Sequence, residues 1–200
     1  ARSLQQIASQ GARKGFYEGD IAGRICAALQ PEGSPLTAED FAAFRAEWVE
    51  PITASYRGYD VYELPPNTQG FTPLQILNLI AGYDVVAWGD GTADYYHHMA
   101  EAVKIAFADR EEWLTDPNFV KIPVQQLISQ AYAHERRRLI DPERALDIAE
   151  VPAGIDYVHP HERRAPDGDT CYFCAADRDG MVVSLIQSIY HDFGSAVVGG

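Results

Sequence analysis

Cysteine, methionine and basic residues are all scarce in this sequence of 200 residues. Three cysteines are too few, and odd in number, for the disulfide framework of a small secreted domain. No apolar run approaches the roughly 20 residues that a membrane-spanning helix needs, so we expect no membrane partner. Acidic residues outnumber basic ones by 29 to 16, and the formal net charge is -13. Because phosphate binding needs a basic face, we also expect no nucleic-acid partner.

What is present is the composition of an ordinary globular chain, with 46% hydrophobic and 22% charged residues, which fits one domain or part of one. Apolar periodicity and capping signals predict helical segments over 4–29, broken at glycines, and over 37–44, 73–80, 93–113 and 124–140. Alternating residues on either side of Arg57-Gly58 predict strands over 52–64. Helices that precede strands, without β-α-β alternation, indicate an α+β fold.

A second pair of strands is predicted near the carboxyl end of the sequence. Pro166-Asp167-Gly168-Asp169 is strong loop punctuation, and the short apolar run 172–176 follows it. Arg178-Asp179-Gly180 then reads as a tight turn into the β-branched run 181–190. The pattern therefore places Thr170 at the head of a β-hairpin.

Cys171 and Cys174 form a C-x-x-C, which raises the alternative of a thiol or metal-binding module. A redox cysteine is typically found at a helix N-terminus, whereas both of these lie in strand-like sequence. Residues three apart on a strand point to opposite faces, which disfavours a disulfide or joint metal ligation. We interpret them as packing cysteines.

Histidines and arginines give further candidate patterns with ordinary explanations. His97 and Glu101 share one face of a predicted helix, but no third ligand is spaced to complete a metal site. We expect His159-Pro160-His161 to lie in a linker. The Arg136-Arg137-Arg138 cluster is interpreted as a solvated face near a helix C-terminus, where cations suit the helix dipole.

Motifs along the whole chain resemble the γ-glutamyltranspeptidase family of N-terminal-nucleophile hydrolases, and their order and spacing make the resemblance specific. The matching segments are Gly15–Ala22, Leu36–Phe41, Tyr56–Tyr59, Leu64–Gly70, Leu74–Asn78, His98, Glu101–Arg110, Asp116–Val120, the Thr170 segment and Phe193–Ser195. The resemblance implies a four-layer αββα arrangement, of which this α+β chain would form a part, and it implies no cofactor.

In that family a precursor cuts itself before a threonine, and the new N-terminal threonine becomes the nucleophile. The alignment of the strand and its turn places the cut between Asp169 and Thr170. The freed α-amino group, with a pKa of about 7.7 to 8.0, can serve as the base that a hydroxyl nucleophile needs. Ser188 occupies the place of a supporting hydroxyl. The resemblance thus implies a self-processing amidohydrolase or acyltransferase that works through an acyl-enzyme on Thr170.

Departures from the family pattern bear on the substrate. Cys171 and Tyr172 stand where a second threonine and a histidine usually follow the nucleophile, and Tyr190 stands where γ-glutamyl enzymes carry a substrate-binding asparagine. The stretch 187–195 is more similar to the branch with oxamate amidohydrolases and cephalosporin acylases. We therefore expect a small-molecule amide substrate with an acidic acyl group, which Tyr190 would contact.

The sequence begins within a helical pattern and has no initiator methionine, so we expect it to be part of a larger precursor. Residues 1–169 would be the C-terminal part of the family's large-subunit region, ending in a linker at about 148–169. Residues 170–200 would begin the small-subunit region. The substrate-binding arginine and the oxyanion-hole glycines of the family would lie in other segments of the precursor, which are expected partners, so the segment alone should be inactive.

Two other questions stay open at this stage. The departures at Cys171, Tyr172 and Tyr190 are also compatible with a noncatalytic remnant or scaffold of the family. A cytoplasmic location is favoured over a periplasmic or secreted one, but the sequence does not decide between them.

Overall fold

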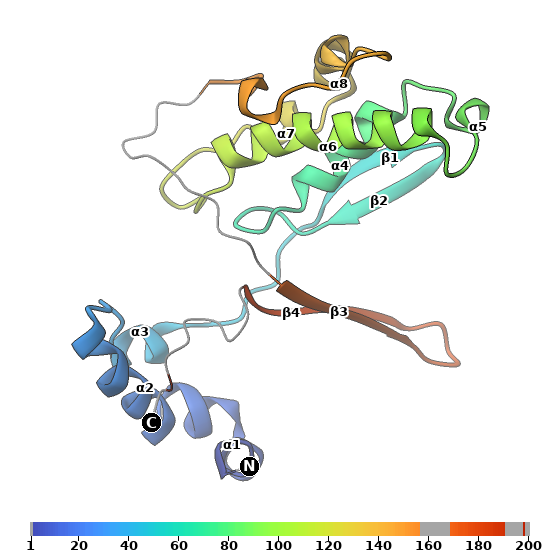
Figure 1. Cartoon of the computed structure of the whole chain (residues 1–200). Helices are drawn as coiled ribbons and strands as arrows, with labels where there is room; N and C mark the ends of the chain where they lie inside the picture. Colours follow the sequence, from blue (N-terminus) through green and yellow to red (C-terminus); the bar gives the residue numbers. More distant parts are fainter. Residues whose placement is uncertain (1, 157–168, 191–197, 199–200) are drawn as a thin grey trace. The chain divides into compact units, whose positions relative to one another are not determined.

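The computed structural model describes residues 2–156, 169–190 and 198, with the backbone alone described at 169–171 and 189–190. Two compact units divide the chain, one of residues 1–47 and 165–200 and the other of residues 48–164. Helices and strands both contribute, as labelled in Figure 1, which agrees with the predicted α+β class. No helix in the described part of the chain is both long enough and apolar enough to cross a membrane.

Short helices make up the N-terminal part of the first unit. They are α1 (Arg2–Ala12), the π-helical turn η1 (Arg13–Tyr17), α2 (Asp20–Leu29), the 3-10 turn η2 (Gln30–Glu32) and α3 (Ala38–Ala43). Of the predicted breaks, Gly11 departs from helical backbone within α1 with a φ of 77°, and Gly19 precedes α2 with extended backbone, whereas Gly15 lies within η1. Gly15 lies so close to the backbone of Ile7 that a Cβ would approach its Cα to 2.8 Å.

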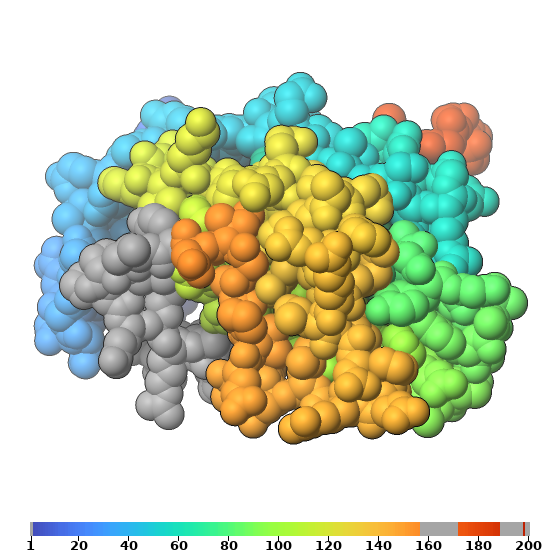
Figure 2. Space-filling model, turned by 90° about the horizontal axis from the view of Figure 1, so that it is seen from above, coloured from blue at the N-terminus to red at the C-terminus, as the bar shows by residue number. Residues whose placement is uncertain are grey.

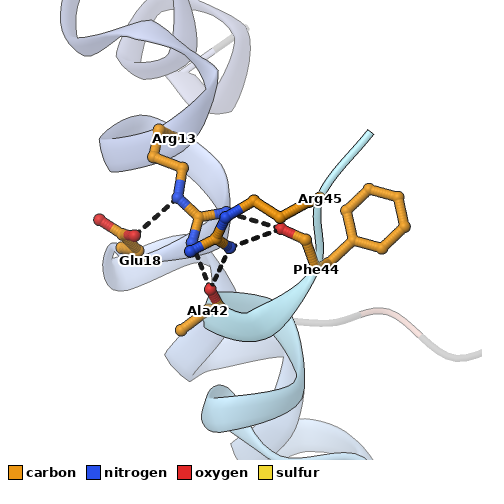
Figure 3. Close-up of polar contacts among 5 residues, drawn as sticks. All are labelled: Arg13, Glu18, Ala42, Phe44 and Arg45. Atoms are coloured by element: carbon orange, nitrogen blue, oxygen red, sulfur yellow. Dashed lines mark hydrogen bonds and ion pairs between the residues drawn. The ribbon is translucent and has the colours of Figure 1, made fainter. Parts of the chain in front are cut away.

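Helix α3 is capped at both ends, by Thr37 at its N-terminus and by the side chains of two arginines at its C-terminus. The Thr37 hydroxyl accepts from the backbone of Asp40 at 3.3 Å, and the Asp40 carboxylate accepts from the backbone of Thr37 at 2.8 Å. This reciprocal pair satisfies two otherwise unpaired N–H groups. At the other end, Figure 3 shows Arg13 and Arg45 donating to the carbonyls of Ala42 and Phe44.

The Arg13 side chain ties η1 to the end of α3. Its Nη1 donates to the Phe44 carbonyl at 2.8 Å, and its Nε pairs with the Glu18 carboxylate at 2.6 Å. Carbonyls at a helix C-terminus have no partner within the helix and carry partial negative charge. The guanidinium therefore serves as a C-cap supplied from another segment of the chain.

The second unit opens with the predicted hairpin of β1 (Ile52–Tyr56) and β2 (Tyr59–Glu63). The strands are antiparallel, with Ile52 opposite Glu63. Arg57 and Gly58 have φ values of 53° and 86°, and positive φ at both central residues is typical of the tight turn that matches strand twist.

Helices form the rest of this unit. They are α4 (Phe71–Ile80), α5 (Val85–Trp88), α6 (Ala93–Trp113), α7 (Val124–Leu127) and α8 (Gln130–Arg136), with 3-10 turns η3 (Arg137–Leu139) and η4 (Ile148–Glu150). The predicted helix over 124–140 is interrupted at Ile128, after which Ser129 caps α8 by accepting from the Tyr132 backbone at 3.2 Å. Gln130 and Ser129 thus start a new helix rather than continuing one.

Helix α4 packs against α6, α8 and the hairpin. Two apolar clusters result from this packing. The first consists of Ile52, Ala54, Phe71, Leu74, Trp113, Leu127, Ile128 and Tyr132. The second consists of Leu79, Ile80, Ala102, Ile105, Ala133 and Ile140. Both clusters include buried residues from one side of α6, so this helix lies in the core of the unit.

Tyr96, Met99, Val103 and Phe107 share helical spacing in the sequence, but they do not form the buried face of α6. Tyr96 is 63% exposed. The face that packs includes His98 and two carboxylates, Glu101 and Asp109, which are 1% and 0% exposed. Buried carboxylates need hydrogen-bonding partners, and these partners come from segments distant in the sequence.

Candidate active site

The backbone of Thr170 lies at the head of a β-hairpin, as predicted. Strand β3 (Asp169–Ala176) pairs antiparallel with β4 (Val182–Tyr190), and Cys171 lies opposite Gln187. The two strands are joined by the expected turn. The structure describes the Thr170 backbone only, so its role as nucleophile stays a prediction.

A register shift occurs at Thr170 itself. Cys171 is opposite Gln187, whereas Asp169 is opposite Tyr190. Two residues of β4, Ser188 and Ile189, therefore face the single residue Thr170. Such a β-bulge bends the strand that carries the extra residue, and bulges are enriched next to active sites, where they redirect side chains. Ser188, the predicted supporting hydroxyl, belongs to the residue pair that faces Thr170.

The turn between the strands is held by one carboxylate. Asp177 Oδ1 accepts from the backbone N–H groups of Asp179 and Met181, each at 2.9 Å. Gly180 has a φ of 84°, in the left-handed region that favours glycine. This short connection fixes the pairing of β3 with β4, and the pairing in turn brings Thr170 to the bulge.

The hairpin exposes apolar side chains on both faces. Those more than half exposed include Tyr172, Phe173, Val182, Val183 and Ile186. Cys174 is an exposed free thiol, while Cys26 is buried in α2. Both members of the C-x-x-C lie in β3, as the strand-like sequence predicts.

Comparison with known proteins shows the family of the whole chain. The family model described as Gamma-glutamyltranspeptidase matches residues 1–200. The chain belongs to the γ-glutamyltranspeptidase family. It is 45% identical to the Glutathione hydrolase-like YwrD proenzyme of Bacillus subtilis, over 100% of this chain and 35% of that protein. It is 39% identical to the Glutathione hydrolase proenzyme of Escherichia coli, over 100% of this chain and 33% of that protein.

A solved structure of the same family agrees with the fold. The cephalosporin acylase from Bacillus halodurans is 41% identical, with a TM-score of 0.79 over 99% of this chain and 33% of that one. The resemblance inferred from the sequence motifs is confirmed, and the acylase agrees with the expected branch. The chain spans about a third of the length of these γ-glutamyltranspeptidase relatives.

The candidate metal pair does not form a site. His97 Nε2 lies 2.7 Å from the carbonyl oxygen of Asp141, while Glu101 is buried and paired with Lys104 at 2.7 Å. Within the parts of the chain that the structure describes, no group of three potential ligands is close enough to hold a metal ion. The interpretation of His97 as a hydrogen-bonding helix residue agrees with these contacts. His159 and His161 lie outside the described residues.

Asp109 is the centre of a buried polar cluster that the sequence analysis did not identify. Its Oδ1 accepts from the Tyr132 hydroxyl and from the Gly154 backbone, both at 2.8 Å, and its Oδ2 accepts from Gln75 Nε2 at 3.0 Å. Burial raises the pKa of Tyr132 well above its ordinary value, and the adjacent Asp109 charge adds to this shift. The Tyr132 hydroxyl therefore stays protonated and donates a hydrogen bond to the Asp109 carboxylate.

The same cluster corrects the interpretation of the arginine cluster as a solvated face for Arg136, and Arg137 is partly buried, whereas Arg138 is exposed as expected. Arg136 is only 6% exposed, lies 3.7 Å from Asp109, and donates to the Pro152 carbonyl at 2.5 Å. Arg137 donates to the Asn78 carbonyl at 3.5 Å, near the C-terminus of α4. A run of arginines is most often exposed, but a buried carboxylate on a facing helix gives Arg136 a partner.

Glu101 forms a second buried carboxylate site eight residues before Asp109. Its Oε1 pairs with Lys104, and its Oε2 accepts from the Leu146 backbone at 2.9 Å. Both carboxylates fall within the family-like stretch 101–110, so the motif match itself was the available signal. Their backbone partners Leu146 and Gly154 could not be deduced because each lies 45 residues further along the chain.

Proposed function

We propose that the protein containing this chain is a self-processing amidohydrolase or acyltransferase of the γ-glutamyltranspeptidase family, with Thr170 as its nucleophile. The proposal rests chiefly on one observation: the strand that begins at Asp169 carries Thr170 at a bulge facing Ser188 and Ile189. Family membership and relatives named as hydrolase proenzymes support it. Residues 1–169 and 170–200 would then belong to the large- and small-subunit regions of a four-layer αββα fold.

Self-cleavage would use the threonine hydroxyl against its own peptide bond. Thr170 Oγ1 attacks the carbonyl carbon of Asp169; a C–O bond forms, the C–N bond breaks, and the hydroxyl proton passes to the departing nitrogen. Water then hydrolyses the resulting ester, which frees the Asp169 carboxylate and restores the Thr170 hydroxyl. The nitrogen, an amide before the cut, becomes an amine that can accept a proton.

The mature enzyme would repeat this chemistry on a substrate. The α-amino group of Thr170 takes the hydroxyl proton as Oγ1 attacks the substrate amide, and the leaving amine receives that proton as the C–N bond breaks. Water or an acceptor amine then resolves the acyl-enzyme. Ser188 would hold the α-amino group by a hydrogen bond, in the role that its position opposite Thr170 suggests.

The substrate is proposed to be a small amide with an acidic acyl group other than γ-glutamyl. Tyr190 pairs with Asp169 across the hairpin, so its backbone lies beside the scissile bond. A tyrosine there offers a single hydroxyl, whereas the carboxamide of an asparagine donates from its nitrogen and accepts at its oxygen, which are two separate atoms. The relatives include proteins named for glutathione and for cephalosporins, so the family accommodates different acyl groups.

The decisive test compares self-cleavage and activity of the purified full-length precursor with those of two variants at Thr170. We expect the wild type to yield two fragments, the smaller beginning at Thr170 by N-terminal sequencing. Thr170→Ala should remain uncut and inactive, because it lacks the attacking oxygen. Thr170→Ser, which keeps a hydroxyl, should still cut and provides the matched control.

Two outcomes would overturn the proposal. One is an active protein with no cut before Thr170, which would place the chemistry elsewhere. The other is a stable, uncut and inactive wild type, which would favour a noncatalytic scaffold of the family. Circular dichroism of each variant distinguishes lost chemistry from lost folding.

A further inference from the structure

Residues 146–155, here named the arm, precede the proposed cleavage site and are held on the second unit by their backbone. Leu146 N–H donates to Glu101 at 2.9 Å, and the Leu146 carbonyl accepts from Lys104 at 2.8 Å. Gly154 N–H donates to Asp109 at 2.8 Å. The arm lies within the orange surface of Figure 2. It thus runs along α6 from one buried carboxylate to the next.

Two further contacts secure the far end of the arm. Arg136 donates to the Pro152 carbonyl at 2.5 Å, and Trp113 Nε1 donates to the Ile155 carbonyl at 2.8 Å. Ile155 also packs against the first apolar cluster. Because these hydrogen bonds are made to backbone carbonyls, they fix the path of the arm and do not depend on the identity of its side chains.

The two residues of the arm that bind the buried carboxylates have the same sequence spacing as the two carboxylates on α6. Glu101 and Asp109 are eight residues apart, and so are their partners Leu146 and Gly154. Eight helical residues rise about 12 Å, a distance that eight extended residues would exceed about twofold. The 3-10 turn η4, over 148–150, shortens the arm between the two carboxylates.

Gly154 shows how closely the arm is fitted. A Cβ at this position would collide with the Tyr132 hydroxyl and approach Arg136 Cδ to 2.7 Å. A larger residue would therefore lift the arm from Asp109. No comparable restriction applies to Gly23 in α2, where a Cβ would meet no described atom within 4 Å beyond its chain neighbours and its own helix backbone.

We propose that Glu101 and Asp109 are positioning residues that keep the arm docked on α6 both before and after cleavage. This inference rests on the proposed self-cleavage at Thr170. Docking leaves fourteen residues between Ile155 and Thr170, whereas an undocked arm would leave twenty-nine between the buried Ile140 and Thr170. Release of the arm would thus double the length of chain between the last anchored residue and the cleavage site. If the rate of the cut falls as the 3/2 power of that length, as loop closure does, release should slow the cut about threefold.

The first experiment compares hydrogen exchange of the arm in two full-length proteins, the cut wild type and the uncut Thr170→Ala variant. Mass spectrometry should show the same slow exchange of the arm amides in both. Loss of protection after the cut would overturn the inference. If no cut occurs, the proposed function fails, but protection in the uncut chain still reports whether the arm is docked.

The second experiment releases the arm. Gly154→Ala in the full-length precursor should raise exchange in the arm, leave α4 and α6 protected, and slow self-cleavage about threefold. Gly23→Ala is the control and should change neither quantity. Trp113→Phe, which removes the donor to Ile155 but keeps an aromatic ring, should shift both in the same direction as Gly154→Ala. Cleavage at the wild-type rate with a released arm would refute the positioning role.

Discussion

Replacing Asp109 by two different residues tests whether its carboxylate organises the buried polar cluster. In Asp109→Asn the remaining carbonyl can accept from Tyr132 and Gly154. The new amide N–H would face Gln75, whose Oε1 is buried without a hydrogen-bond partner among the described residues. A turn of the Gln75 amide would bring that oxygen into place. The main loss is then the charge opposite the buried Arg136, for which we expect about 3–5 kcal/mol of destabilisation.

Asp109→Leu offers none of these compensations. It would leave the Tyr132 hydroxyl, the Gly154 N–H and the Gln75 amide without their acceptor, at about 1–3 kcal/mol each. Arg136 would keep its charge in a buried site, and losing one partner of a buried ion pair costs about 3–5 kcal/mol. Since such losses overlap, we expect the total to exceed that of Asp109→Asn by at least about 1–3 kcal/mol.

Native-state hydrogen exchange of the α6 amides provides the assay, because their slowest exchange reports the opening free energy of this unit. The measurement uses full-length precursor carrying Thr170→Ala, so that cleavage does not change the sample. A free-energy loss for Asp109→Leu that is no larger than that for Asp109→Asn would refute the reasoning. It would mean that Asp109 contributes volume and not hydrogen-bond acceptance.

Two further predictions concern α3 and the substrate. Hydrogen bonds from the Thr37 side chain and backbone hold the pKa of Asp40 below its ordinary value. The ionised Asp40 carboxylate therefore stabilises the folded state at pH values above its ordinary pKa. This stabilisation is lost as the pH falls through the lower pKa that Asp40 has in the folded state. Exchange protection of α3 in wild type should exceed that in Asp40→Asn at pH of about 6, and the two should converge once the pH falls below the lowered pKa of Asp40; a constant difference would contradict this. Tyr190→Asn in the full-length enzyme should raise the ratio of kcat/KM for a γ-glutamyl anilide over a glutaryl amide by about tenfold, and an unchanged ratio would show that position 190 does not select the acyl group.

Local signals predicted much of the fold correctly. Thr37 and Asp40 carry a cap within four residues of sequence, and Arg57-Gly58 carries a turn within two, so no distant contact is needed to recognise either. The Asp177 turn and the strands beside it belong to the same class. These features formed as predicted because their stabilising partners are close in sequence.

Long-range contacts account for what the sequence did not predict. Arg136 appeared exposed because its partner Asp109 belongs to another helix. Ser129 begins α8 within an apolar pattern that reads as one continuous helix. The bulge at Thr170 depends on the register of two strands, which periodicity alone does not fix. Residues 151–155, expected within a linker, instead contribute Pro152, Gly154 and Ile155 to contacts with buried side chains.

The apolar hairpin has a practical consequence for producing the protein. Tyr172 and Ile186 are each 62% exposed, and a two-stranded sheet with uncovered faces is marginal in water. Its free edges can also pair with strands of other molecules. We therefore expect residues 1–200 expressed alone to aggregate more readily than the proposed full-length precursor.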